Sequence, residues 1–383
     1  MSVDHKAGDP GPASSRVKRR FAVEMICPYE PGKPIREVQQ ELGIDTVIKL
    51  ASNENPLGPS PLVIETLNRT SLDLHTYPDY DGWYLRQAIA RKVGLGMDSV
   101  VVGAGSADLM RLIAEVYLAP GTEAIVADLC FPVYANVARI AGADVVTVPL
   151  DDNLQYDLGG MLEAVSDRTR VVFIASPNNP TGLAIPREDL ARFLAGLPAN
   201  VLCVLDLAYH DYVDPNRRPD PLELLGRHSN LVLLHTFSKV YGLAGLRIGY
   251  VVAEDDVVAA LCRVRIPFIT STPAQVAGRM ALRDQEHAKQ SVALNKAMRQ
   301  RLEHDLEAIG SRVYPSSANF VLADIGVDPE PVFQSMLRRG FIVRPMRDPR
   351  LATCLRITTG TSEQTAQVTA ALRDVLEELG GSE

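Results

Sequence analysis

Residues 236–250 read TFSKVYGLAGLRIGY, and this stretch decides the fold. The apolar run before it, Leu231–Leu234, predicts a short buried strand that delivers Lys239 into a glycine-rich loop. Because lysine strongly prefers exposure, a lysine directly after a core strand indicates chemistry. Its amine can form an imine with a carbonyl if its surroundings lower its pKa. Further along, Arg247 supplies a planar cation suited to phosphate. The alternative is a surface turn with two cations, but together the two residues meet the needs of a pyridoxal 5'-phosphate (PLP) site.

The composition is that of a soluble globular protein with room for two domains. The chain has 383 residues, of which 46% are hydrophobic and 22% charged. It therefore exceeds the length at which a single core normally stops growing. The formal charge of −8 argues against a general nucleic-acid binder, and no apolar run reaches the length that spans a bilayer. We expect neither nucleic acid nor a membrane among its partners.

A basic cluster, Arg16–Arg20, lies in an N-terminal stretch rich in Gly, Pro, Ser and Asp. This composition predicts a disordered tail over residues 1–22, and a nuclear-targeting or lipid-binding role is the alternative. The five cysteines are scattered, without C-x-x-C spacing or nearby histidine pairs. They are typical of reduced thiols in cytoplasm that pack as small hydrophobic residues, and they predict neither a disulfide framework nor a metal site.

Short β-branched runs alternate with helical stretches between residues 99 and 252. Several runs are apolar on both faces, as in a parallel sheet covered by helices. The pattern predicts a doubly wound, mostly parallel α/β sheet with ligands beyond the carboxyl ends of its strands. The expected strands are Val100–Val102, Ala124–Ala127, Val145–Val148, Val171–Ala175, Val201–Leu205, Leu231–Leu234 and Ile248–Val252. The expected helices include Asp108–Tyr117, Val133–Ala141, Leu158–Val165 and Arg187–Leu194.

After residue 253 the pattern becomes that of a smaller α+β domain. It predicts one long helix over residues 274–309, then strands at Asn319–Ala323, Ile342–Val343 and Leu355–Ile357, with helices at Pro331–Arg339 and Ser362–Leu379. We place a large PLP-binding domain at residues 49–268 and a small domain at residues 269–383. Residues 23–48 are expected to form an N-terminal arm that packs with the small domain.

Two residues near the end of one expected strand fit the ring of PLP. Asp206 follows Val201–Leu205, and a carboxylate there can keep the pyridinium protonated, so that the ring withdraws electrons. Tyr209 can donate to the ring oxygen and tune the imine. A helix cap for Asp206 and a half-buried core position for Tyr209 are the alternatives.

Two loops complete the expected cofactor site. Ser176–Gly182 follows a strand, and its prolines and glycine fix a loop from which Asn179 can donate to the ring oxygen, although a simple turn has the same composition. Gly103–Asp108 joins a strand to a helix, where free N–H groups bind phosphate. The expected phosphate-binding residues are Gly105, Ser106, Ala107, Thr236, Ser238 and Arg247, while Phe131 either stacks on the ring or lies in the core.

These residues, in this order, resemble the fold-type I, class I and II aminotransferases, and within them the histidinol-phosphate aminotransferase branch. The likeness spans about residues 26–380. Besides the segments already quoted, it rests on Pro28–Pro34, Ser52–Pro59, Tyr77–Asp79, Asp206–Tyr209, Ser317–Phe320, Ile342–Met346 and Leu355–Thr358. The resemblance implies an aspartate aminotransferase-like fold and a homodimer.

The resemblance also assigns roles. Lys239 would form the internal imine and move the substrate proton, and Tyr77 would reach the partner subunit's cofactor phosphate. Arg356 would grip the substrate's anionic group, and Arg344 would add a cation for a substrate phosphate. Tyr29 and Asn55 would contact substrate. From the residues alone, Arg356 alternates with apolar neighbours, as a surface arginine on a half-buried strand also would.

The chain departs from the family pattern at Leu207, His235, Ala107 and Asp348–Arg350. These departures leave the imine machinery intact, and with His210 they bear on the substrate. The resemblance implies transamination between histidinol phosphate and 2-oxoglutarate, a step of histidine biosynthesis. The alternatives are an aromatic amino acid aminotransferase, a specialised-metabolism PLP enzyme of the same fold, and a non-catalytic PLP-fold regulator.

Overall fold

A seven-stranded sheet forms the centre of the molecule, in the order β2-β8-β7-β6-β5-β3-β4. The computed structural model describes residues 19–26, 32–70, 73 and 75–380. In the sheet, β8 runs antiparallel to both neighbours, and the other pairs are parallel. The strands are β2 (Val100–Gly103), β3 (Glu123–Ala127), β4 (Asp144–Val148), β5 (Thr169–Ala175), β6 (Leu202–Asp206), β7 (Leu231–Thr236) and β8 (Gly249–Val252).

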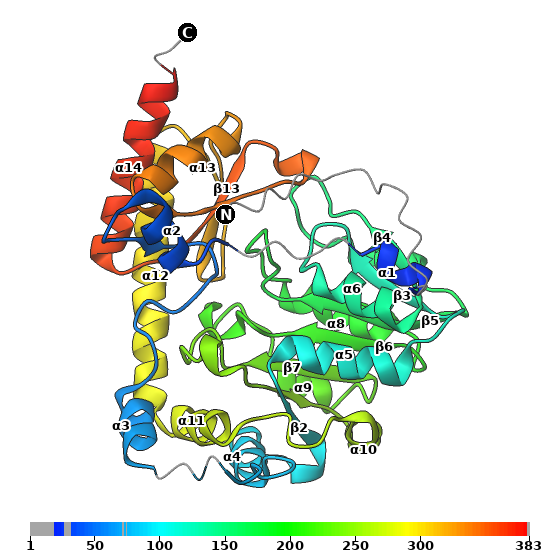
Figure 1. Cartoon of the computed structure of the whole chain (residues 1–383). Coiled ribbons are helices and arrows are strands. Elements are labelled where there is room, and N and C mark those ends of the chain that lie inside the picture. The colour runs from blue at the N-terminus through cyan, green and yellow to red at the C-terminus, as the bar shows by residue number, and fades with distance from the viewer. Residues whose placement is uncertain (1–18, 27–31, 71–72, 74, 381–383) are drawn as a thin grey trace.

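Helices cover both faces of this sheet (Figure 1). Successive residues of a strand face opposite sides, so Val172 and Ile174 of β5 join one core cluster while Val171 and Phe173 join another. The first cluster includes residues of α3 (Pro61–Arg69), α4 (Trp83–Val93), α7 (Leu158–Glu163), α8 (Arg187–Gly196), α9 (Pro221–Leu225) and α11 (Thr272–Arg283). The second includes residues of α5 (Ser106–Tyr117), α6 (Val133–Ala141) and α10 (Asp255–Val264). The predicted doubly wound α/β architecture is confirmed.

A smaller α+β unit packs beside the large sheet (Figure 1). Its antiparallel sheet has the order β12-β13-β10-β9 and shares a core with three helices. The N-terminal arm adds β1, which pairs in parallel with β11. The elements are β1 (Ile48–Lys49), β9 (Arg312–Tyr314), β10 (Phe320–Asp324), β11 (Phe341–Ile342), β12 (Arg344–Pro345), β13 (Cys354–Thr358), α12 (Gln285–Ala308), α13 (Pro329–Arg338) and α14 (Ser362–Gly380).

The prediction of one helix over residues 274–309 was wrong. Two helices, α11 and α12, meet at Asp284, whose side chain accepts a hydrogen bond from the His287 N–H (3.1 Å) and caps the second helix. The same carboxylate accepts the Ser60 hydroxyl. An aspartate at this position favours a helix start over continuation of the previous helix.

Short elements account for the remaining regular structure of the described residues. They are α1 (Phe21–Glu24), α2 (Ile35–Leu42) and the 3₁₀ turns η1 (Met97–Ser99), η2 (His210–Tyr212), η3 (Ala244–Leu246) and η4 (Pro349–Leu351). Helix α1 overlaps the last two residues of the predicted tail, whose residues 1–18 lie outside the described part. Among the described helices, none combines the length and apolarity needed to cross a membrane.

Candidate active site

A pocket of about 720 Å³ lies where the carboxyl ends of the large-sheet strands meet the small sheet. Residues from both halves of the chain line it, including most of those predicted from the sequence. The predicted residues in its wall are Ser106, Ala107, Phe131, Asn179, Asp206, Tyr209, Thr236, Ser238, Lys239, Arg247, Arg344 and Arg356. Lys239 and Asp206 therefore line one cavity.

Lys239 enters this pocket three residues after β7 ends. Its Nζ donates to the carbonyl oxygens of Ser52 and Asn53, at 3.1 Å each, and lies 5.6 Å from the centre of the Tyr209 ring. Gly242 closes the loop with a φ of +67°, and a Cβ there would lie 2.2 Å from the Gly58 carbonyl oxygen. Only glycine fits this close approach, which fixes the lysine loop against the N-terminal segment.

Asp206 is the last residue of β6 and is only 5% exposed. Its Oδ2 accepts the Tyr134 hydroxyl (2.8 Å), and its Oδ1 accepts the Ala208 N–H (2.9 Å). Burial raises the pKa of Asp206, while these two hydrogen bonds and the charge of Lys239 act in the opposite direction. These three partners favour the ionised form of the carboxylate and oppose the effect of burial.

Tyr209 is held at its hydroxyl and at its ring. The Asn53 side-chain amide donates to the Tyr209 Oη at 2.9 Å, and the ring packs edge-on against Phe320. Burial raises the pKa of Tyr209, and the positive charge of Arg356 opposes this. The phenol is therefore a neutral hydrogen-bonding group at neutral pH.

On the side of the pocket opposite Asp206, hydroxyl groups and the guanidinium group of Arg247 surround the start of α5. The Thr236 hydroxyl donates to the Ser238 Oγ at 2.9 Å, and Arg247 Nη1 donates to the Ala244 carbonyl at 3.0 Å. Gly105 has a φ of +85°, and a Cβ there would lie 2.6 Å from Arg247 Nη2. The glycine therefore leaves room for the guanidinium beside the free N–H groups of the helix, which together bind a phosphate well.

A second cationic region lies on the small-sheet side of the pocket, formed by Arg344, Arg347 and Arg356. Arg344 on β12 and Arg356 on β13 are direct cross-strand partners, so their side chains share one face of the sheet. Arg356 Nη1 donates to Asn179 Oδ1, and its Nη2 donates to the Ala51 carbonyl at 2.7 Å. Arg356 thus connects the small sheet to the loop that carries Asn179, the predicted hydrogen-bond donor to the ring oxygen of the cofactor.

Three of the predicted residues that the structure describes do not line this pocket. Gly105 is next to the pocket behind Arg247, and Asn55 donates instead to the Val240 carbonyl and the Ser291 hydroxyl at 2.9 Å each. Tyr77 is 81% exposed and stacks on Phe268 at the surface. Tyr29 lies outside the described residues.

Sequence reasoning missed Tyr134, Asn53, Asp128 and Arg347, which also line the pocket. Tyr134 lies on an apolar stripe of α6, so nothing in its local pattern distinguishes it from a core tyrosine. Asn53 belongs to the quoted segment 52–59, but a β-strand period gives no reason to choose it over Asn55. Its backbone has a positive φ of 55°, and its carbonyl oxygen accepts a hydrogen bond from Lys239 Nζ.

The residues present fit PLP. The space that Gly105 leaves beside Arg247 suits a phosphate, the Asp206 carboxylate suits a ring nitrogen, and Lys239 supplies an amine at the same cavity. A site of this composition, at the carboxyl edge of a doubly wound sheet, defines a PLP-dependent enzyme.

Comparison with known proteins agrees with this class. The family model described as "Aminotransferase class I and II" matches residues 45–372, and the chain belongs to this family. It is therefore a PLP-dependent aminotransferase, as the sequence predicts.

Relatives and solved structures support the same family. A histidinol-phosphate aminotransferase of Moorella thermoacetica is 43% identical over 371 residues, which is 96% of each chain. A crystal structure of histidinol-phosphate aminotransferase from Sinorhizobium meliloti, in complex with pyridoxal-5'-phosphate, superposes with a TM-score of 0.88 at 28% identity and covers 96% of this chain and 99% of its own. An aspartate aminotransferase of Thermus thermophilus, at 23% identity and a TM-score of 0.77, covers 94% of this chain and 100% of its own and confirms the fold alone.

Proposed function

We propose that this chain transfers the amino group of histidinol phosphate to 2-oxoglutarate. The observation that carries the proposal is the pairing of Arg344 with Arg356 across β12 and β13. Two guanidinium groups on one face of the sheet, both in the pocket wall, are suited to bind one anionic group together. Because the proposed site of the cofactor phosphate lies at Arg247, this second cationic region suits an anionic group of the substrate.

The same region suits both halves of a transamination cycle. It must hold a phosphate in one half-reaction and a dicarboxylate in the other, and guanidinium groups bind both in bidentate fashion. Arg347, on the loop after β12, adds a third cation to the pocket wall. The relatives named as histidinol-phosphate aminotransferases, at 43% identity over nearly the whole chain, support this substrate.

The chain's own residues then have defined tasks. When bound, PLP supplies a ring that withdraws electrons from the reacting carbon. Asp206 holds a proton on the ring nitrogen, and Tyr134 keeps that carboxylate ionised. Lys239 Nζ would take the proton from the substrate carbon as a general base and release it on the cofactor side of the substrate nitrogen. Tyr209 and Asn179 hold the ring oxygen by hydrogen bonds, and Arg356 orients the substrate anion.

A steady-state assay with histidinol phosphate and 2-oxoglutarate tests the substrate. We expect turnover that falls strongly when histidinol, which lacks the phosphate, replaces histidinol phosphate. Absence of turnover while phenylalanine or tyrosine reacts well would refute the substrate proposal and favour an aromatic amino acid aminotransferase.

The Lys239→Ala variant tests the role of the lysine. It should lose both transamination and the absorbance band of the lysine-bound cofactor, because no other amine replaces Nζ. An Arg283→Ala variant, which changes an arginine remote from the pocket wall, is the control and should keep both. Turnover by Lys239→Ala would exclude this residue as the base.

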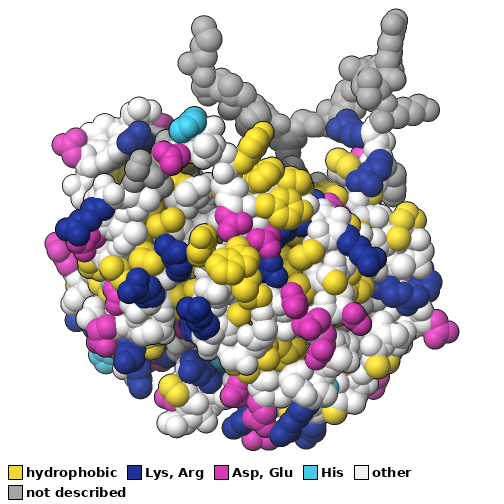
Figure 2. Space-filling model, turned by 90° about the horizontal axis from the view of Figure 1, so that it is seen from below, with side chains coloured by type: hydrophobic (Ala, Val, Ile, Leu, Met, Phe, Trp, Pro, Cys, Tyr) yellow, Lys and Arg dark blue, Asp and Glu magenta, His cyan; other side chains and the backbone are white. Residues whose placement is uncertain are grey.

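We further propose that the protein is a cytoplasmic homodimer in which Tyr77 reaches the partner subunit's cofactor phosphate. The face formed by α3, α4 and the segment before α11 shows a cluster of hydrophobic side chains (Figure 2). Large exposed side chains on this face include Leu57, Ile64, Tyr77, Tyr80, Trp83, Tyr84 and Phe268. Monomers rarely expose so many large apolar groups together, so a second copy of the chain is the expected occupant. The domain boundaries at residues 49–268 and 269–383 are part of the same proposal.

A further inference from the structure

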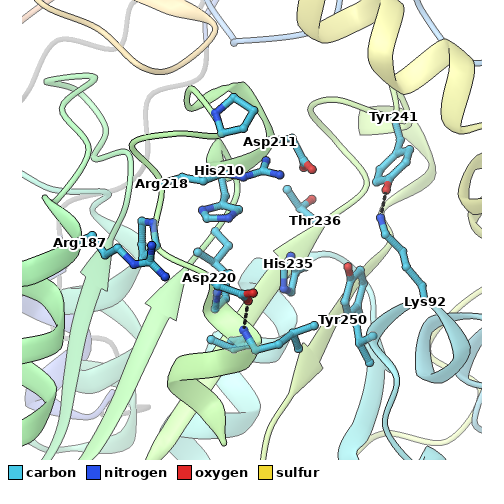
Figure 3. Close-up of a pocket in the computed structure, with 17 residues that line it drawn as sticks. Lys92, Arg187, His210, Asp211, Arg218, Asp220, His235, Thr236, Tyr241 and Tyr250 are labelled. Carbon is cyan, nitrogen blue, oxygen red and sulfur yellow. Dashed lines mark hydrogen bonds between the residues drawn. The ribbon is translucent and has the colours of Figure 1, made fainter. Parts of the chain in front are cut away.

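A second pocket, of about 450 Å³, lies on the other face of β7 from the cofactor site. His235 and Thr236 are successive strand residues, so their side chains point to opposite faces of the sheet. Thr236 bonds Ser238 in the cofactor site, whereas the His235 ring stacks on Tyr250 at 4.6 Å. Figure 3 shows this pocket between His210 and Asp220 on one side and Lys92, Tyr241 and Tyr250 on the other.

His210 gives the pocket a buried polar group that lacks a partner. The side chain is 8% exposed, and its Nδ1 has no hydrogen-bond partner among the described residues. Burial lowers the pKa of His210 to about 4, so the ring is neutral near pH 7 and offers one donor and one acceptor. Since buried polar groups in proteins are nearly always satisfied, this nitrogen points to a ligand or water in the pocket.

Charges of both signs line the same space. Arg218 and Asp211 both face the pocket, and neither makes a side-chain hydrogen bond or ion pair within the part of the chain that the structure describes. Lys92 is bonded to the Tyr241 hydroxyl, and Asp220 caps α9 by accepting the Leu222 and Glu223 N–H groups.

The remaining wall is apolar or aromatic, with Val93, Leu207, Leu233, Tyr241 and Tyr250. An arginine and an aspartate that are both available, beside a neutral imidazole and an apolar wall, match a small zwitterion with an apolar side chain.

The pocket also contacts the segments that carry the catalytic groups. His210 directly follows Tyr209, and Tyr241 lies two residues beyond Lys239 on the same loop. Thr236 lines both pockets. A ligand that moves any of these backbone segments therefore changes the surroundings of the cofactor.

We propose that this pocket binds an L-α-amino acid with an apolar or aromatic side chain, and that its occupancy alters the cofactor site through β7 and the lysine loop. Arg218 would bind the carboxylate, Asp211 the ammonium group, and His210 Nδ1 a polar atom of the ligand. The inference does not depend on which substrate the active site uses.

The test needs a probe that cannot react with the cofactor. N,N-dimethyl-L-phenylalanine keeps both charges, but its tertiary amine cannot condense with an aldehyde. Isothermal titration of the PLP-loaded enzyme should show saturable binding at one site per chain. N-acetyl-L-phenylalanine, which lacks the positive charge, and N,N-dimethylphenethylamine, which lacks the carboxylate, should bind roughly tenfold more weakly or worse. Equal binding of the N-acetyl compound would overturn the zwitterion assignment.

Matched variants locate the binding. Arg218→Gln and Asp211→Asn should each weaken the probe by roughly tenfold, because each removes one charge-assisted hydrogen bond. Arg217→Gln, an exposed neighbour outside the pocket wall, is the control and should bind as the wild type does. Wild-type affinity in Arg218→Gln would show that the probe binds elsewhere. His210→Leu should weaken binding, and His210→Asn, which places a polar atom near the position of Nδ1, should restore part of it.

The absorbance of the bound cofactor reports the coupling. At a probe concentration near the wild-type Kd, the pH titration of that absorbance should shift in the wild type and shift much less in Arg218→Gln. Binding without any shift in the wild type would refute the coupling to the cofactor site.

Discussion

The Tyr134–Asp206 hydrogen bond is the residue-scale feature on which the proposed chemistry depends. Burial raises the pKa of Asp206, and the tyrosine hydroxyl lowers it again by bonding to the charged form. A Tyr134→Phe variant should therefore raise this pKa and move the acid limb of the kcat/KM profile to higher pH. A hydrogen bond to a charged group contributes about 1.5–3 kcal/mol, so we expect a loss of about tenfold or more in kcat near the acid limb.

Tyr156→Phe provides the comparison, because Tyr156 is equally buried but bonds the loop through Asn178 rather than Asp206. It should lower stability without moving the acid limb of the pH profile. An unshifted profile in Tyr134→Phe would mean that Asp206 is kept ionised by its other partners, the Ala208 N–H and Lys239.

His210 should make folding sensitive to acid. The unfolded chain takes up this proton near pH 6.5, whereas burial delays its uptake in the folded chain to about pH 4. Of the charged groups that face the ring, Asp211 and Asp220 raise this pKa and only partly offset the burial, whereas Arg218 lowers it further. Stability is thus unaffected above pH 7 and falls as the pH drops from 6.5 toward 4, by about 3 kcal/mol at most.

Chemical denaturation of wild type and His210→Asn at pH 7.5 and pH 5 measures this effect. The variant should lose less stability than the wild type between the two values. The same loss in both proteins would assign the acid sensitivity to other groups.

At the scale of elements, one ion pair connects the end of β3 to the loop after β12. Asp128 Oδ1 accepts the Leu129 and Leu150 N–H groups, and its Oδ2 lies 2.6 Å from Arg350 Nη2 in η4. Asp128 and the neighbouring Asp348 both line the active site. The pair therefore holds the loop of residues 346–351 over the substrate side of the pocket.

Breaking this pair should weaken substrate binding more than it slows the chemistry. We expect Arg350→Ala to raise KM several-fold with little change in kcat, because the loop closes less often over the substrate. Asp128→Asn keeps the Oδ1 acceptor and removes the charge, so Arg350→Ala should add little in that background. Additive effects of the two changes would show that Arg350 acts on the anionic substrate directly, without the pair.

The sequence predicts the strands of the large sheet better than it predicts the helix ends and the contacts between distant segments. Apolar runs located every strand of the large sheet to within about two residues, since buried strands need such runs on both faces. The break between α11 and α12 at Asp284 was missed because the residues around it favour helix. The first helix ends there because the Asp284 carboxylate accepts hydrogen bonds from the Ser60 hydroxyl and the His287 N–H. Tyr134, Asn53 and the Asp128–Arg350 pair were missed for a related reason: their roles exist only in contacts between distant segments.

At the scale of the whole molecule, Tyr77 is the residue that bears most directly on the proposed homodimer. A tyrosine that is 81% exposed and stacked on Phe268 contributes nothing to the pocket of its own chain in the described structure. Tyr77 and Tyr80 both contact the ring of Phe268. Figure 2 shows hydrophobic side chains gathered on the face that α3 and α4 form. In a two-fold dimer the same face meets itself, so each copy contributes the same side chain to the other.

Mixing two inactive variants distinguishes contribution across the interface from contribution within one chain. Tyr77→Ala should hold PLP weakly and lose most activity at limiting cofactor, and Lys239→Ala should lose all of it. If the tyrosine acts across the interface, a hybrid dimer contains one site with Lys239 from one chain and Tyr77 from the other. Unfolding and refolding the two together in equal amounts should then restore roughly a quarter of wild-type activity, since half of the dimers are hybrids with one complete site each.

Arg283→Ala in place of Tyr77→Ala provides the control. The Arg283→Ala chain keeps both Tyr77 and Lys239. Its mixture with Lys239→Ala should therefore give roughly half of wild-type activity, whether Tyr77 acts on its own chain or on the partner. If Tyr77 serves its own chain, no hybrid of the two inactive variants contains a complete site, and the mixture stays at the average of its parents. Because the two arrangements predict different activities from the same chains, any gain above that average assigns the active site to the dimer rather than to the single subunit.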